Sequence, residues 1–263
     1  MSICYGIVLF IHWWTDYGTN HIKRRVAALV MTAFLVLYAT LLLSWEDPSI
    51  GCYRNNNLDP YCNLAGYIDR AVFTEAHIME KTDPEGLFST LTASFTTFVG
   101  YCFGLMLLKH KKNLDTLIKY WLLVAFLCLL AIYPCSLMMP FNKRLYTLTF
   151  LFAVLSTSIT VLTLFLILID YVPKAGGSMP IWVRPLTWLG MNPLAIFIVL
   201  QLLFDIMKNW ITVGDSTPYQ IFYDACFSWM NPGIGTAIYA LFYGLIYTIV
   251  AGILFKFKIF IRL

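Results

Sequence analysis

Charged residues are scarce in this sequence. Asp, Glu, Lys and Arg together make up 12% of its 263 residues, whereas a soluble domain carries roughly 25%. Hydrophobic residues make up 60%, and the mean hydropathy is +0.73. A water-soluble fold cannot leave so much apolar surface exposed. The composition therefore excludes an ordinary soluble enzyme and predicts an integral membrane protein whose immediate environment is the lipid bilayer.

The sequence also lacks the short motifs of common soluble enzymes. It contains no phosphate-binding loop, no paired Cys-x-x-Cys metal motif and no Gly-x-Ser-x-Gly nucleophile motif. We therefore expect no metal site and no nucleic-acid partner. The polar residues that remain to carry chemistry lie at the ends of the apolar segments and in the loops between them.

The apolar residues form long segments. A helix needs about 20 apolar residues to cross a membrane, and six segments reach or approach this length. They are Val26–Trp45, Leu87–Leu108, Leu117–Met139, Leu145–Ile169, Pro193–Met207 and Ile234–Phe255. Ser2–Trp14 is apolar but short, and is predicted to be a truncated first span. The predicted fold is an all-α, polytopic transmembrane helix bundle of about seven spans, forming a single transmembrane domain over residues 1–263.

Basic residues are distributed unevenly between the two sides of the predicted bundle. Twelve of the 18 Lys and Arg residues fall in one set of loops and in the C-terminal segment. Because basic loops favour the cytosolic side, the C-terminus is predicted to be cytosolic. The two long loops, 46–86 and 208–233, are then predicted to face a lumen or the exterior.

Two of the seven cysteines differ from the others in their surroundings. Cys52 and Cys62 both lie in the polar loop 46–86, whereas the other five fall in or beside apolar segments, where cysteine is usually a small buried hydrophobe. A disulfide between Cys52 and Cys62 is plausible if the loop faces an oxidising compartment. Two free thiols are the alternative.

Three residues of the same loop are candidates for binding a polar substrate. Asp69 and Arg70 are adjacent, and they could either pair to hold the loop against the membrane or orient a substrate at the mouth of the bundle. His77 is the one histidine placed where it could transfer a proton on the lumenal side, although a loop histidine is commonly a simple surface residue. On the cytosolic side, Asn192 and Pro193 have the pattern of a helix start, which with Arg184 could bind an anion.

The order of several motifs resembles that of a known family. These motifs are Gly51-Cys52, Tyr61-Cys62, Ala65-Gly66-Tyr67-Ile68-Asp69-Arg70, Asp83-Pro84-Glu85-Gly86-Leu87, Asn142-Lys143, Gly190-Met191-Asn192 and the basic, aromatic tail 256–263. From about residue 51 to its end, the chain is similar to the C-terminal half of heparan-alpha-glucosaminide N-acetyltransferase and its relatives. Residues 1–50 match only in hydropathy.

This resemblance implies an activity and a co-substrate. The family transfers an acetyl group from acetyl-CoA across the lysosomal membrane to the amine of a terminal glucosamine of heparan sulfate. Its catalytic histidine belongs to an N-terminal portion, and neither His12 nor His77 matches that position. No catalytic residue is therefore assigned, and the chain is expected not to be catalytic as it stands. The resemblance places Arg184, Lys258 and Arg262, with Asn192, near the phosphates of CoA, which need several donors.

Two other functions remain open from the sequence. One is a non-catalytic membrane subunit of a larger complex, whose partners would be other membrane subunits, a missing N-terminal half or a second copy of the chain. The other is a sugar or small-solute permease. Transporters often contain inverted repeats, and the absence of a convincing internal repeat counts against transport.

Overall fold

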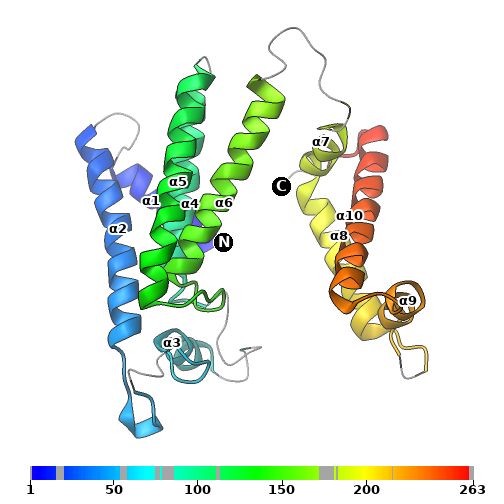
Figure 1. The fold of residues 1–263 in the computed structure, drawn as a ribbon, viewed down its shortest axis with the longest axis horizontal. Helices are drawn as coiled ribbons and strands as arrows, with labels where there is room; N and C mark the ends of the chain where they lie inside the picture. Colours follow the sequence, from blue (N-terminus) through cyan, green and yellow to red (C-terminus); the bar gives the residue numbers. More distant parts are fainter. Residues whose placement is uncertain are drawn as a thin grey trace. The chain divides into compact units, whose positions relative to one another are not determined.

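The structure is a computed structural model that describes residues 2–15, 21–53, 58–74, 78, 86–110, 113–171, 181, 183–214 and 216–260. Within these ranges the regular secondary structure is entirely helical, apart from two isolated β-bridges. The chain divides into two compact units, Met1–Tyr171 (unit 1) and Val172–Leu263 (unit 2), which are drawn together in Figure 1 and described separately below. A single transmembrane domain stays a prediction.

Six helical segments of the described chain are long and apolar enough to cross a membrane. They lie in α2 (His21–Ser44), α4 (Thr90–His110), α5 (Leu114–Met138), α6 (Leu148–Phe165) with the π-helix η3 (Leu166–Tyr171), α8 (Pro193–Asp205) with the π-helix η5 (Ile206–Trp210), and α10 (Pro232–Lys256). The apolar helix α1 (Ser2–Thr15) is shorter. The predicted all-α, polytopic architecture is confirmed, and the protein is an integral, multi-pass membrane protein.

The two long loops contain short helices that the sequence analysis did not predict. Loop 46–86 holds the 3-10 turn η1 (Pro48–Ile50) and α3 (Leu64–Phe73), and loop 208–233 holds α9 (Pro218–Phe227). A further short helix, α7 (Val183–Met191), precedes α8. These helices have only nine or ten residues, too few for a transmembrane hydropathy signal, so hydropathy alone could not reveal them.

The core of unit 1 lies between α4, α5 and α6. Trp121 is 1% exposed and packs against Phe103 with ring centroids 5.1 Å apart. On the same face of α5, the carbonyl of Ala125 accepts a hydrogen bond of 3.0 Å from the Ser156 hydroxyl of α6. Such packing and interhelical hydrogen bonding hold helices together in lipid, where the hydrophobic effect between them is absent.

The turn between α5 and α6 is held by polar side chains. The Asn142 carbonyl oxygen Oδ1 accepts hydrogen bonds from the backbone amides of Arg144 (2.9 Å) and Leu145 (3.2 Å). The Tyr38 hydroxyl of α2 donates to the backbone carbonyl of Leu145. Thr147 is fully buried and its hydroxyl donates to the carbonyl of Pro140 at 3.0 Å. The turn is thereby fixed to α2.

Unit 2 packs α7 and α8 against α10. Ile196 and Leu200 of α8 form a buried cluster with Ala251 of α10, and Trp188 of α7 packs against it. The start of α10 is capped: Asn231 accepts from the amide of Gly233 at 3.1 Å, and Pro232 is the first residue of the helix. The start of α9 is fixed by a capping box between Thr217 and Gln220.

Trp121→Ala tests the core of unit 1. We expect it to lower the free energy of unfolding by about 3 kcal/mol or more, because it removes a large buried side chain and leaves a cavity. Leu130→Ala is the matched control on the same helix, since Leu130 is 55% exposed and should change stability by less than about 1 kcal/mol. Equilibrium unfolding in mixed micelles measures both, and equal losses would contradict the assignment of the core face.

Candidate functional site

The polar loop of unit 1 is organised around the start of α3. Asn63 is fully buried, and its Oδ1 accepts a hydrogen bond of 2.6 Å from the amide of Gly66. Its Nδ2 donates to the carbonyls of Asp59 (2.7 Å) and Pro60 (3.2 Å). One side chain therefore caps the helix and holds the segment that leads into it.

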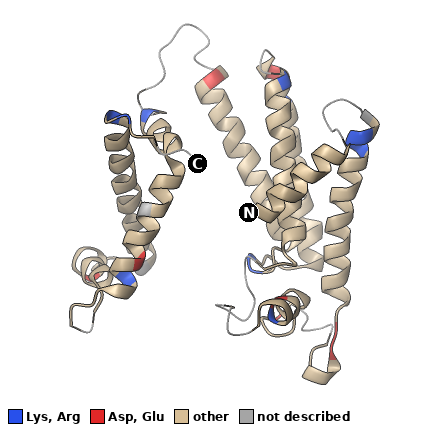
Figure 2. Cartoon of the chain, turned by 180° about the vertical axis from the view of Figure 1, so that it is seen from behind, with Lys and Arg blue, Asp and Glu red and all other residues tan. Residues whose placement is uncertain are grey.

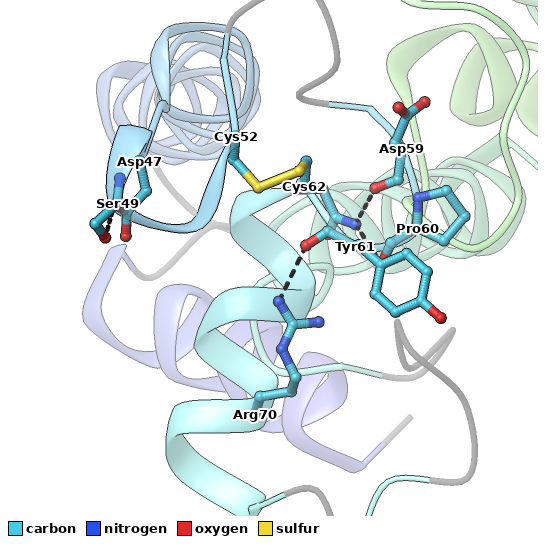
Figure 3. The surroundings of a disulfide bond; sticks show 9 residues. Asp47, Ser49, Cys52, Asp59, Pro60, Tyr61, Cys62 and Arg70 are labelled. Carbon is cyan, nitrogen blue, oxygen red and sulfur yellow. Dashed lines mark hydrogen bonds between the residues drawn. A yellow bond between two sulfur atoms is a disulfide. The ribbon is translucent and has the colours of Figure 1, made fainter.

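A disulfide joins Cys52 to Cys62, with their Cα atoms 5.1 Å apart. Cys52 also forms a β-bridge with Asp47, and the Asp47 carboxylate accepts from the Ser49 amide in the turn between them. Figure 3 shows that the disulfide connects this turn, which follows α2, to the segment before α3. Of the two alternatives that the sequence left open, a disulfide and two free thiols, the structure contains the disulfide.

Asp69 lies on the buried face of α3 and is fully buried. Its Oδ1 accepts a hydrogen bond of 2.8 Å from the backbone amide of Leu87, just before α4. A Cβ atom added to Gly86 would lie 2.0 Å from the Asp69 Oδ2. Only glycine fits there without displacing the carboxylate, so Asp69 and Gly86 together fix α3 to the start of α4.

Arg70 points to a different part of the loop. Its guanidinium donates a hydrogen bond of 3.2 Å to the carbonyl of Tyr61, next to the disulfide (Figure 3). The two adjacent residues thus bind separate segments, Asp69 the start of α4 and Arg70 the disulfide segment. The third predicted residue of this loop, His77, lies outside the described residues.

A pocket of about 750 Å³ lies between α7 and α10 in unit 2. Its lining residues are Arg184, Thr187, Trp188, Ile249, Gly252, Ile253, Phe255 and Lys256. A Cβ atom added to Gly252 would come within 2.9 Å of the Trp188 ring, so glycine allows α7 to approach α10 closely. Figure 2 shows basic residues where α7 begins and α10 ends, at the same end of this unit.

The pocket combines two kinds of binding group. Arg184 and Lys256 supply positive charges, and Trp188 and Phe255 supply aromatic rings whose centroids are 6.3 Å apart. Guanidinium and ammonium groups bind phosphates, and aromatic rings stack on planar groups. The pocket therefore suits a ligand that carries both phosphates and an aromatic base. Lys256, which is not among the predicted site residues, lines it together with Arg184.

Asn192 serves a structural purpose in this unit. It is fully buried, and its Nδ2 donates a hydrogen bond of 2.9 Å to the carbonyl of Ile259. The helix α8 begins at Pro193 as expected, but the Asn192 side chain does not cap it, which corrects the predicted cap. Lys258, one residue before the held carbonyl, is exposed and has a left-handed backbone with φ of 55°. Arg262 lies outside the described residues.

Two further polar arrangements were not predicted. His12 of α1 is hydrogen bonded through Nδ1 to the Tyr101 hydroxyl of α4 at 2.6 Å. On α10, Tyr239, Tyr243 and Tyr247 form a row in which successive ring centroids are 4.8 and 5.9 Å apart. The four-residue spacing of the tyrosines is visible in the sequence. The histidine–tyrosine contact joins residues 89 positions apart and has no local signal.

Neither protein-family models nor curated proteins give a match to this sequence. Among the described residues, no group of three or more His, Cys, Asp or Glu side chains is arranged to hold a metal ion. The α7–α10 pocket is therefore the candidate binding site on the strength of its own geometry. In unit 1, Asp69 and Arg70 connect α3 to the start of α4 and to the disulfide segment.

The pair Asp69–Gly86 can be tested with a double-mutant cycle. Asp69→Ala should lower the free energy of unfolding by about 1–3 kcal/mol through the loss of a buried hydrogen bond. Gly86→Ala should also destabilise, because its methyl group meets the carboxylate. In the double variant the methyl group occupies the space left by the carboxylate, so the total loss should be smaller than the sum.

Thermal unfolding of the four proteins measures this coupling, with Asp59→Ala as a control because the Asp59 side chain is exposed. Strictly additive losses would show that the two residues do not meet.

Proposed function

We propose that this chain is part of a transmembrane acetyltransferase that moves an acetyl group from acetyl-CoA to an amino sugar, such as the terminal glucosamine of heparan sulfate. The observation that carries the proposal is the α7–α10 pocket, where Arg184 and Lys256 lie together beside aromatic rings. The order of motifs in the sequence supports the same family. The chain supplies the CoA-binding part, and none of its residues is assigned as catalytic.

CoA has the chemistry that this pocket accommodates. Its phosphates are anionic, and its adenine ring is planar. Arg184 and Lys256 would bind phosphate oxygens, and Trp188 or Phe255 would stack on the base. Lys258 follows directly on α10 and would add positive charge at the same end. For Arg262, a role in binding CoA rests on the resemblance alone. Asn192 would act by holding the backbone of this tail through the carbonyl of Ile259.

The proposed orientation follows from charge and redox chemistry. The basic C-terminal segment would be cytosolic, which places the CoA pocket where acetyl-CoA is available. The Cys52–Cys62 loop would face a lumen, because structural disulfides persist in oxidising compartments. By resemblance the membrane would be lysosomal. Asp69 and Arg70 would then shape the lumenal mouth at which the sugar arrives.

Binding of CoA to the purified chain in nanodiscs tests the proposal. We expect Arg184→Ala and Lys256→Ala each to weaken CoA binding by about tenfold, since each removes a charge-assisted hydrogen bond to phosphate. The matched control is Lys208→Ala, because Lys208 belongs to the same unit but does not line the pocket and instead lies over the Phe204 ring. This variant should stay within about twofold of the wild type.

Isothermal titration with CoA, and with dephospho-CoA as a ligand of lower charge, gives the affinities. Absence of CoA binding at millimolar concentration, or equal losses in all three variants, would contradict the assignment. In that case a non-catalytic subunit that packs against other membrane proteins would be the better description.

A further inference from the structure

A second basic site lies in unit 1, between the start of α2 and the end of α4. A groove of about 500 Å³ is lined there by Arg24 of α2 and by Cys102, Leu105, Met106, Leu108, Lys109 and His110 of α4. Its lining contains no acidic residue. The part at the helix ends is therefore cationic, and the part that continues along α4 is apolar. This groove belongs to unit 1 and the pocket described above to unit 2, so the following inference does not rest on the proposed function.

The first turn of α2 concentrates positive charge at an unfavourable position. It reads His21-Ile22-Lys23-Arg24-Arg25 and contains no acidic residue. The amino end of a helix carries a partial positive charge and is stabilised by anions, so three cations there repel the helix dipole and one another. Lys109 in the last turn of α4 adds to this charge from the neighbouring helix. An anion bound in the groove would relieve the repulsion.

Arg24 differs from the two basic residues beside it. Lys23 and Arg25 are exposed, as expected of residues that set topology through charge alone. Arg24 is only partly exposed, and its Nε atom is buried without a hydrogen-bond partner among the described residues. A buried donor without a partner is costly. The preference of basic residues for the cytosolic side does not require that the Arg24 Nε atom be buried. A ligand bound in the groove explains this burial.

We propose that this groove binds an anionic phospholipid of the surrounding leaflet. The phosphate would lie between Arg24 and Lys109, and an acyl chain would follow Leu105 and Met106 along α4. Basic recesses between transmembrane helices at the membrane surface are suited to anionic headgroups.

The apolar lining favours a lipid over a soluble anion, because a free phosphate would use only the cationic part of the groove. The position of the groove along the membrane normal also fits a lipid headgroup, because the groove is formed at the ends of two spanning helices. Nearby in the chain, Trp13 and Trp14 at the end of α1 are 76% and 59% exposed. Exposed tryptophans are typical of the membrane interface.

Native mass spectrometry of the purified chain, titrated with phosphatidylglycerol or phosphatidylcholine, tests the proposal. We expect the wild type to bind phosphatidylglycerol at least about fivefold more tightly than phosphatidylcholine, and Arg24→Gln to reduce that binding by about fivefold or more. Arg25→Gln removes the same charge from an exposed position one residue away, and should change binding by less than about twofold. Equal effects of the two variants would mean that diffuse surface charge is responsible and would overturn the proposal.

Two additional measurements distinguish a lipid site from a site for a soluble anion. Leu105→Trp keeps every charge but fills the apolar part of the groove, so it should reduce phosphatidylglycerol binding as Arg24→Gln does. Circular dichroism in phosphatidylcholine nanodiscs shows whether Arg24→Gln folds. If it does not, Leu105→Trp still tests the groove. Inorganic phosphate and CoA should not displace the bound lipid at millimolar concentration. Displacement by either, or normal binding by Leu105→Trp, would contradict a lipid site.

Discussion

The constraint on which the rest of this structure depends is that hydrocarbon offers no partner for a backbone hydrogen bond. The spanning segments satisfy it by forming helices. The connections between helices cannot do so, and polar side chains bind their backbone instead: the buried Asn63 and Asp69 around α3, the partly buried Asn142 in the α5–α6 turn and the buried Asn192 beside α8. Each of these polar groups binds backbone. These hydrogen bonds connect the described segments at the ends of the helices to one another.

The polar residues that hold segments together differ from the charged residues that line the pockets. Four residues of the sequence motifs, Asp69, Gly86, Asn142 and Asn192, tether one segment to another. The charged groups that line the two pockets used in the proposals are different residues and are cations, among them Arg184 and Arg24. These motif residues therefore have a structural role in the described chain, whereas Arg184 and Arg24 lie outside the motifs.

Position within the fold decides what each cation does. A count of Lys and Arg residues treats all of them as equal contributors to topology. The structure distinguishes Arg24, whose Nε is buried, from the exposed Arg25 next to it. It also brings Lys256 into the same pocket as Arg184, although 72 residues separate them in the chain. Both proposals use these differences, and each concerns a separate unit with its own ligand chemistry.

The sequence by itself determined the helical, membrane-spanning nature of the chain, because hydropathy is a local property and a helix satisfies its own backbone. It predicted about seven spans, and the described chain has six helices long enough to cross a membrane and the shorter helix α1. It also indicated the helix start at Pro193, which depends on adjacent residues. Only the tertiary structure decided that Cys52 bonds to Cys62, that Asn192 binds the tail, and that His12 meets Tyr101. Such contacts depend on how helices pack, and packing leaves no periodic signal in the residues that it brings together.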